Sequence, residues 1–348
     1  MSWSVKWPAL AMAAMLALLT PAGAAPPLHP VSPTAALVPA GTPAAGAEVV
    51  TVGVYPTVVD DLNVAASTYD VVAYVWFKWK GPIDPTVGLE FTNATERQNF
   101  VQHKLLETPA TLKDGSRYQL LQIHGRFFQP FSLIDFPFDR QTLDLALEDE
   151  VNASHRIAYV PDLKESGFGS NLQVPGWRTL GWHAEATMQD YASHFGAPEL
   201  AGSSRHAGLR FGIVIARRAS FFVWKLFLPL LIVLSANWLA FLIKPDLVDV
   251  RTALTATALL TLVFLQKSYS DDLPEVGALV LMDKIYAVAY LLVIATLAHV
   301  VAMATWQKHA EVTEARIVRV DWTSLAVHVA FFAAAVSVIV MSAGQSSP

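Results

Sequence analysis

The spacing of apolar and polar residues divides the chain into a strand-rich part and an apolar part. Between residues 48 and 219, short runs rich in β-branched and aromatic residues are separated by turn signals such as Gly81-Pro82 and Asp114-Gly115. The clearest runs cover residues 48–59, 69–80, 117–128, 141–149 and 209–218. Because no helical period lies between them, they predict a β-sandwich of roughly 170 residues, which is the size of one domain.

Four long apolar segments follow, at residues 221–243, 250–269, 277–305 and 322–341. Each is long enough for a helix that crosses the hydrocarbon core of a membrane, which takes about 20 residues. The composition agrees, because 53% of the residues are hydrophobic and only 15% are charged, whereas soluble domains run nearer about a quarter charged. We therefore expect an extracellular or periplasmic β-sandwich (residues 48–219) followed by a four-helix transmembrane bundle (residues 220–343).

The loops between the spans predict their orientation in the plasma membrane. The first connection holds Lys244 and Arg251, and the third holds Lys308, Arg316 and Arg319, whereas the second, residues 270–277, has no basic residue. Loops with an excess of Lys and Arg stay in the cytoplasm. Both termini are therefore expected outside, on the periplasmic side if the cell is bacterial and the membrane its inner one.

The N-terminus predicts export. Residues 1–25 combine an early Lys6, an apolar run from Ala9 to Leu19 and small residues before two prolines, which is the layout of a cleavable signal peptide and is too short to span. Residues 26–47 are rich in Pro and Ala and are expected to form a leader. The chain contains no cysteine, which excludes disulfides, thiolate metal sites and a cysteine nucleophile.

Three motifs in a fixed order carry a resemblance to a known family. The segment FSLIDFPFDRQTLDLAL, residues 131–147, contains Phe-Pro-Phe-Asp, the segment ARRASFFVWKLFLPLL, residues 216–231, enters the first span, and DDLPEVG, residues 271–277, follows the second. With the four spans, these motifs resemble the pentameric ligand-gated ion channels, the Cys-loop receptor superfamily, from about residue 48 to the end. Gln129 and Leu143 stand where the animal receptors carry the bridging cysteines, so the chain resembles the prokaryotic branch, which lacks the bridge.

This resemblance implies a homopentamer around a central pore that opens when a ligand binds between subunits of the β-domain. It also implies that the Phe-Pro-Phe-Asp loop presses on the linker after the second span. Asp139 and Arg217 are then expected partners, because either charge alone at this junction would be costly; a simple folding contact between them is the alternative. The residues expected to couple the two domains are Phe136, Pro137, Phe138, Asp139, Arg217 and Pro274.

The second span carries a polar stripe that a helix facing only lipid would not need. Residues three and four positions apart share one face of a helix, and this face collects Asp249, Ala253, Thr257, Leu260, Phe264, Lys267, Ser268 and Asp271. Polar groups at membrane depth must face protein or water, so the stripe is expected to line a water-filled pore. The alternative is a helix packed in a bundle, with its threonines bonded to their own backbone.

Each part of the stripe has an expected role. Asp249 would form a ring of carboxylates that concentrates monovalent cations, and Leu260 and Phe264 would form apolar constrictions. Lys267, near the outer mouth, either extends sideways to the membrane interface or pairs with Asp271. Arg251 falls off the stripe and is expected to anchor at the lipid headgroups.

The ligand site implied by the resemblance lies between subunits, beneath the loop of residues 191–208. Its candidate residues are Trp76, Glu148, Asp149, Glu150, Tyr191, His194 and Phe195. Aromatic rings beside carboxylates suit a small cationic ligand. As alternatives, each acid is a solvated turn residue, and Trp76 and Trp79 belong to the core of the sandwich.

Three functions are compatible with this pattern. The main hypothesis is a cation-selective channel opened by an unknown small-molecule agonist, and the second is a proton-gated channel of the same fold, with His299 in the third span as a candidate titrating group. The third is a membrane-anchored binding protein, which leaves the stripe unexplained. The sequence has no catalytic motif, no cofactor motif and no histidines at metal-ligand spacing, and a net charge of −5 gives no sign of a nucleic-acid partner.

Overall fold

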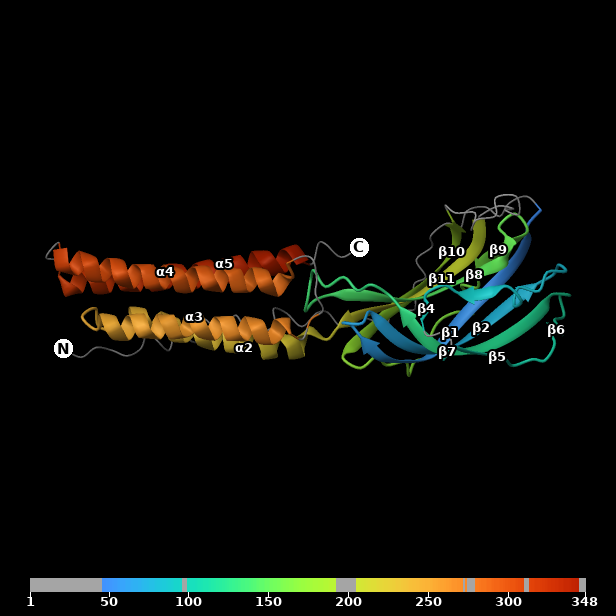
Figure 1. The fold of residues 1–348 in the computed structure, drawn as a ribbon, viewed down its shortest axis with the longest axis horizontal. Coiled ribbons are helices and arrows are strands. Elements are labelled where there is room, and N and C mark those ends of the chain that lie inside the picture. Colours follow the sequence, from blue (N-terminus) through green and yellow to red (C-terminus); the bar gives the residue numbers. More distant parts are fainter. Residues whose placement is uncertain are drawn as a thin grey trace.

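The protein consists of a β-sandwich and a rod of four helices that meet end to end (Figure 1). The computed structural model describes residues 46–95, 99–191, 205–271, 273, 279–309 and 313–343. The predicted export signal and almost all of the predicted leader lie outside the described residues.

The sandwich has two sheets, whose strands are mostly antiparallel. The larger sheet has the order β4-β7-β2-β1-β9, with β5 and β6 also pairing with β7, and the smaller has the order β10-β11-β8-β3. The strands are β1 (Glu48–Asn63), β2 (Thr68–Trp79), β3 (Leu89–Phe91), β4 (Ala94–Thr95), β5 (Val101–Lys104), β6 (Ala110–Thr111), β7 (Arg117–Phe128), β8 (Arg140–Ala153), β9 (Ile157–Pro161), β10 (Trp177–Asp190) and β11 (Arg205–Arg217).

Alternation along the strands builds the core of the sandwich. In β2, Val75, Phe77 and Trp79 are buried against the other sheet, while Tyr74 and Lys78 face the opposite way. The five runs predicted from the sequence form β1, β2, β7, β8 and β11, so those predictions are confirmed. The 14-residue strand β10 was not predicted, because it mixes charged and polar residues into its apolar positions.

The four predicted spans are helices, and each is long and apolar enough to cross a membrane. They are α2 (Ala219–Trp238), which ends in a 3-10 turn η1 (Leu239–Phe241), α3 (Val248–Ser270), α4 (Leu281–His309) and α5 (Glu314–Ala343). The chain is therefore a multi-pass membrane protein with the predicted order of a sheet-rich domain followed by four apolar helices.

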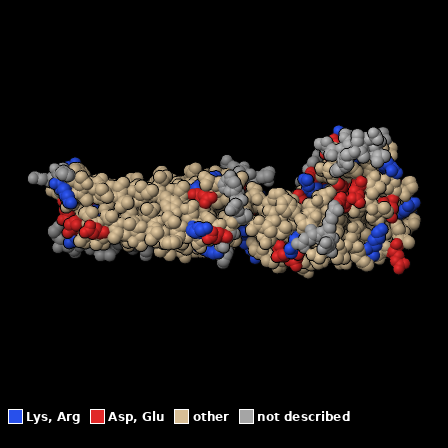
Figure 2. All heavy atoms as spheres, in the orientation of Figure 1, with Lys and Arg blue, Asp and Glu red and all other residues tan. Residues whose placement is uncertain are grey.

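The helix bounds differ from the prediction mainly at α5, which begins at Glu314 rather than at Trp322. Residues 314–321, EARIVRVD, contain four charged side chains, so the apolar pattern used for the prediction starts only after them. They are helical all the same, because Glu, Ala and Arg are good helix formers. On the face shown in Figure 2, charged residues gather toward the two ends of the rod and are absent from the stretch between them. This distribution fits a helical bundle whose middle lies in hydrocarbon.

Candidate functional site

The face of α3 that carries the polar stripe is not used for packing within the subunit. All eight stripe residues are exposed, and the side chains of Leu260 and Phe264 are 57% and 65% exposed. The buried side of the same helix holds Arg251, Thr255, Ala258, Leu262 and Tyr269, which face the rest of the bundle. The sequence pattern therefore separates an inner face from an outer face of α3.

The hydroxyls of Thr257, in the stripe, and of Thr261, one turn further along α3, are bonded to the backbone of their own helix. The hydroxyl of Thr257 donates to the carbonyl of Ala253 at 2.8 Å, and that of Thr261 donates to the carbonyl of Thr257 at 2.8 Å. The structure thus contains the helix-internal bonds of the alternative interpretation. Because the hydroxyl proton is used in this bond, the oxygen of Thr257 presents only acceptor lone pairs outward.

Lys267 pairs with Asp271 one turn further along α3, which decides between the two alternatives for this residue. Both side chains are exposed, and the pair joins residues at positions i and i+4. Exposed pairs of this kind add little stability. Their charges compensate each other at the end of α3 that lies toward the β-domain.

Arg251 does not anchor at the lipid headgroups, and that expectation was wrong. Its side chain is 1% exposed and forms an ion pair with Asp321 of α5 inside the bundle. Asp321 also receives a hydrogen bond from His299 of α4. The sequence could not reveal this pairing, because Asp321 lies 70 residues after Arg251.

The predicted partners Asp139 and Arg217 form a two-pronged ion pair at the junction of the domains. The Nε and Nη2 atoms of Arg217 donate to Oδ1 and Oδ2 of Asp139 at 2.7 and 3.0 Å. The side chains are only 8% and 1% exposed. Parallel bonds of this kind fix the orientation of both groups, because the guanidinium and carboxylate planes must match.

Aromatic rings and an amide complete the surroundings of this pair. The guanidinium of Arg217 lies over the rings of Trp177, Phe136 and Phe222, with its central carbon 4.2 Å, 5.1 Å and 5.3 Å from the ring centroids. Gln141 donates to Asp139 at 2.9 Å and to the carbonyl of Ser132 at 2.7 Å. Of these neighbours, Phe136 was predicted from its motif, whereas the contacts of Trp177, Phe222 and Gln141 with the pair were not.

The Phe-Pro-Phe-Asp loop enters the top of the helical bundle. Leu133 and Phe136 are buried in the hydrophobic core of the bundle, and Pro137 follows Phe136 through a cis peptide bond. The carbonyl of Ile134 accepts a hydrogen bond from the N–H of Leu281, the first residue of α4, at 2.9 Å. Phe138 is 37% exposed, and its expected partner Pro274 lies outside the described residues.

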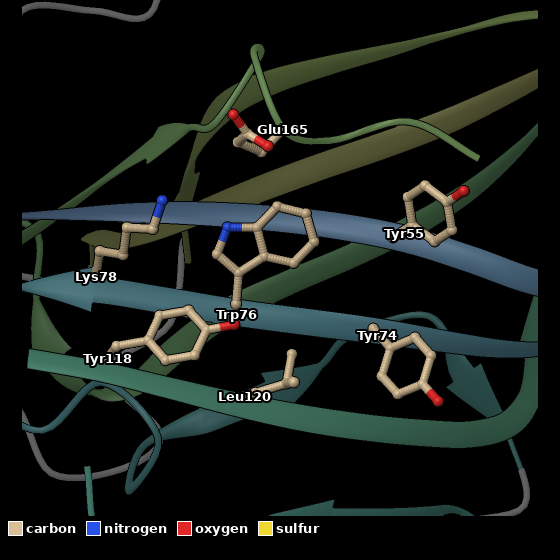
Figure 3. Close-up of a pocket in the computed structure, with 7 residues that line it drawn as sticks. All are labelled: Tyr55, Tyr74, Trp76, Lys78, Tyr118, Leu120 and Glu165. Carbon is tan, nitrogen blue, oxygen red and sulfur yellow. The ribbon is translucent and has the colours of Figure 1, made fainter. Parts of the chain in front are cut away.

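A pocket of about 490 Å³ lies on the outer face of the larger sheet (Figure 3). Trp76 lies in it, and alternate residues of the same strand line it, which is a period-2 pattern that the sequence analysis did not use. Its lining residues are Tyr55 of β1, Tyr74, Trp76 and Lys78 of β2, Tyr118 and Leu120 of β7, and Glu165. Trp79 points the other way and belongs to the core.

Asp162 holds the polar ends of two pocket side chains. Its Oδ2 atom accepts from Nε1 of Trp76 at 3.1 Å and from Nζ of Lys78 at 3.2 Å. Burial acts to raise the pKa of Asp162, but these hydrogen bonds outweigh it and lower the pKa below its usual value. The carboxylate therefore stays ionised and compensates the charge of Lys78.

Gly53 makes room for the indole of Trp76. The two residues face each other across β1 and β2, and a Cβ atom at Gly53 would lie 2.0 Å from the Trp76 ring. Only glycine lets the ring lie flat across β1, so this glycine positions the main aromatic surface of the pocket.

A second group of candidate ligand residues lies on the smaller sheet. The hydroxyl of Tyr191 donates to Oε1 of Glu148 at 2.6 Å, and its ring meets that of His206 edge to face. The hydrogen bond to Glu148 raises the pKa of Tyr191 to about 12. His194 and Phe195 lie outside the described residues.

The three neighbouring acids of β8 differ from the expected turn residues. They belong to a strand, and Glu148 and Asp149 are buried while Glu150 is exposed. Asp149 accepts from the backbone N–H groups of Val151 and Asn152 at 3.0 and 2.6 Å, so its carboxylate holds its own strand end and does not face outward. Of the three acids, only Glu150 is exposed, and the buried Glu148 is reached by the hydroxyl of Tyr191.

The pocket around Trp76 and the cluster around Tyr191 lie on different sheets of the sandwich. Among the described residues, no group of three or more histidines and acids has the geometry of a metal site. The pocket and the cluster are therefore two separate surfaces of one chain, each with aromatic rings and a carboxylate.

Comparisons with known proteins agree with the motifs. No protein-family model matches the chain. The chain is 32% identical over 83 residues to gamma-aminobutyric acid receptor subunit gamma-3 of Homo sapiens, which covers 24% of this chain and 18% of that subunit. It is 22% identical over 177 residues to pH-sensitive chloride channel 2 of Drosophila melanogaster, which covers 50% and 33%. It is 20% identical over 208 residues to gamma-aminobutyric acid receptor subunit beta of Caenorhabditis elegans, which covers 59% and 36%.

These relatives are receptor subunits and a channel, not enzymes, and their similarity supports the Cys-loop receptor superfamily. The alignments span only 18% to 36% of the relatives' own length.

Breaking the Asp139–Arg217 pair should destabilise the protein strongly. Asp139→Asn leaves a buried guanidinium without its counter-charge, which costs about 3–5 kcal/mol. As a control, Asp190→Asn breaks the exposed pair with Arg205 and should cost at most about 1 kcal/mol. The swap of Asp139→Arg with Arg217→Asp should recover part of the loss. Unfolding midpoints of the purified protein are measured for these three variants and for Asp139→Arg and Arg217→Asp alone, and strictly additive losses in that cycle would count against contact.

Adding one methyl group at Gly53 should disturb the pocket. Gly53→Ala forces the Trp76 ring to move, an overpacking cost of about 1–3 kcal/mol. Gly169→Ala is the matched control, because its Cβ would meet the Tyr55 hydroxyl at an ordinary 3.5 Å. In a Trp76→Ala background the Gly53→Ala loss should vanish. Unfolding midpoints test this, and an equal loss in both backgrounds would show that the two residues are not coupled.

Proposed function

We propose that the chain is one subunit of a ligand-gated ion channel, a homopentamer in which α3 lines the pore. The observation that carries the proposal is the stripe of eight exposed residues on a helix of membrane-spanning length, three of which are charged. Ionisable groups at this depth must face water or protein. Five copies of α3 around an axis give the stripe a water-filled channel to face.

The positions of the two candidate ligand surfaces also favour an oligomer. The Trp76 pocket and the Tyr191 cluster lie on different sheets, so a ligand that touches both must sit between two chains. A neighbouring copy that brings one of these surfaces against the other completes such a site. The same arrangement would place ligand binding at the contact between subunits.

We also propose that the channel selects cations. Asp249 is exposed at the end of α3 away from the β-domain, where five copies would form a ring of negative charge. Thr257 presents acceptor oxygens, which suit a cation rather than an anion, because an anion needs the hydroxyl proton that Ala253 already binds. At the other end, the charge of Lys267 is compensated by Asp271. The Drosophila relative is named as a chloride channel, so selectivity needs a direct test.

The proposed agonist is a small molecule with a cationic amine. The pocket offers the rings of Tyr55, Tyr74 and Trp76, and its lysine is compensated by Asp162. The facing cluster would add the carboxylates of Glu148 and Glu150. Aromatic faces and carboxylates favour an ammonium group. The human and nematode relatives are named for gamma-aminobutyric acid, which also carries an ammonium group.

A proton-gated channel is the second candidate, favoured by the Drosophila relative that is named as pH-sensitive. His206 lies beside the acidic strand β8, with its Nδ1 atom 2.7 Å from the carbonyl of Asp149. A step in external pH without any amine separates the two candidates. As part of the proposal, residues 1–25 direct export, and both termini lie outside the plasma membrane.

Recording from the purified full chain in a planar lipid bilayer tests the function. Amines, acids, calcium and pH steps are applied to each side in turn. Current that appears only with an added amine supports the first candidate, and current that follows external pH alone supports the second. Current under neither condition, from protein shown to be inserted, would argue for a membrane-anchored binding protein instead.

Water should reach the stripe of α3 but not the outer face of α5. The chain has no cysteine, so a single introduced thiol has no background. Leu260→Cys and Val327→Cys replace residues that are 57% and 64% exposed in the subunit. Only a thiol in water ionises and reacts with a charged methanethiosulfonate, so Leu260→Cys should react at least about tenfold faster. Equal slow rates at both positions would contradict a pore along α3.

Asp249 should matter more for cation conduction than Asp271. Asp271 is exposed and paired with Lys267, so its charge is compensated. Asp249 would face a narrow part of the pore. There the attraction between two unit charges at 4 Å rises from about 1 kcal/mol, as in bulk water, to about 4 kcal/mol at a dielectric constant of about 20. Asp249→Ala should therefore lower cation conductance several-fold, and Asp271→Ala should change it little. Single-channel currents and reversal potentials in asymmetric salt measure both. A wild-type reversal potential that follows the chloride gradient would show that the channel selects anions.

A further inference from the structure

A buried ion pair joins α3 to the rest of the bundle at the end away from the β-domain. Arg251 donates from Nε to the carbonyl of Ala240 in η1 at 2.7 Å and from Nη2 to Oδ1 of Asp321 in α5 at 2.9 Å. Both charged side chains are 1% exposed. One arginine thus ties three segments together at the start of the pore helix.

His299 of α4 completes this cluster. Its Nε2 atom lies 2.7 Å from the same Oδ1 atom of Asp321. An ionised carboxylate only accepts hydrogen bonds, so Nε2 carries the proton, and Nδ1 faces the hydroxyl of Ser324 at 3.4 Å. The ring of Phe241 covers His299, and His328 packs on the same ring while bonding to the carbonyl of Ser324.

Within the described part of the chain, the second oxygen of Asp321, Oδ2, has no hydrogen-bond partner. Both donors converge on Oδ1, although a carboxylate has room for more bonds on its other oxygen. Asp321 is therefore held by its ion pair with Arg251 and its hydrogen bond with His299, both through Oδ1, and not by further hydrogen bonds to Oδ2.

The position of Arg251 along α3 gives this pair its importance. Arg251 comes two residues after Asp249 and two before Ala253, so it lies about 3 Å along the axis from each and about 200° around the helix. Its charge is thus behind the pore face at the depth of the Asp249 ring. An uncompensated Arg251 would add a positive charge per subunit next to that ring.

We propose that Asp321 is a specificity-determining residue for permeation, because it neutralises Arg251 inside each subunit and leaves Asp249 to set the field at this end of the pore. His299 is a positioning residue that holds Asp321 on the guanidinium. This inference rests on the proposed role of α3 as the pore helix.

The test compares wild type with Asp321→Asn, Arg251→Gln and the double variant, all in the full chain. In asymmetric NaCl, Asp321→Asn should lower the sodium-to-chloride permeability ratio by roughly threefold or more, because it exposes the charge of Arg251. The double variant should return to the wild-type ratio. His299→Gln keeps a donor toward Asp321 and should shift the ratio less than Asp321→Asn. Asp283→Asn, at the opposite end of the bundle, is the control and should leave the ratio unchanged.

A second readout guards against variants that do not assemble. Asp321→Asn should lower the unfolding midpoint of the detergent-purified protein by roughly 5–10 °C, more than the double variant does, because a single substitution leaves an unpaired buried charge. If Asp321→Asn does not assemble at all, rescue of assembly and of selectivity by the added Arg251→Gln supports the pair. A double variant that is as damaged as the single one overturns it.

The outcomes separate this inference from the proposed function. A wild type that selects chloride removes the proposed cation selectivity, but Asp321→Asn should then still shift the ratio further toward chloride. A wild type that conducts cations, with an Asp321→Asn ratio unchanged from it, overturns the role of Asp321 and leaves the channel proposal standing. A wild type that conducts no ions removes both.

Discussion

The ion pair between Arg217 and Asp139 is the contact on which the arrangement of the two domains depends. Arg217 is the last residue of β11 and stands two residues before α2, so it lies where a sheet becomes a helix. The carboxylate and three aromatic rings hold its guanidinium from several sides. A planar charged group so enclosed tolerates little rotation. The direction in which the first helix leaves the sandwich is therefore set by a single side chain.

Polar groups within the bundle are handled in two different ways. Arg251, Asp321 and His299 satisfy one another inside the subunit, while the eight stripe residues of α3 stay exposed in the single chain and make their described polar contacts within α3 itself. Both arrangements obey the rule that polar groups at membrane depth need water or protein around them. The buried cluster needs no partner outside the bundle. The exposed stripe, in contrast, needs water or a neighbouring subunit beside it.

The sequence predicted the helices and strands better than the contacts between them. Runs of β-branched residues located β2 and β7, and apolar length located the four helices, because burial acts directly on local composition. Strand β10 and the first turns of α5 were missed, since their charged residues conceal helix or strand preference. The pairing of Arg217 with Asp139 followed from a motif, but that of Arg251 with Asp321 depends on how helices cross, which no local pattern contains.

The hydrogen bond between Ile134 and Leu281 links the first turn of α4 directly to the β-domain. It ties the first N–H of a 29-residue helix to a loop of the β-domain. His299 lies 18 residues further along, which is about 27 Å at 1.5 Å per residue. A tilt of about 5° at Leu281 moves such a point by about 2 Å, enough to take a hydrogen bond out of its normal range. A rotation of the sandwich that tilted α4 would therefore have a large effect where His299 of α4 contacts Asp321.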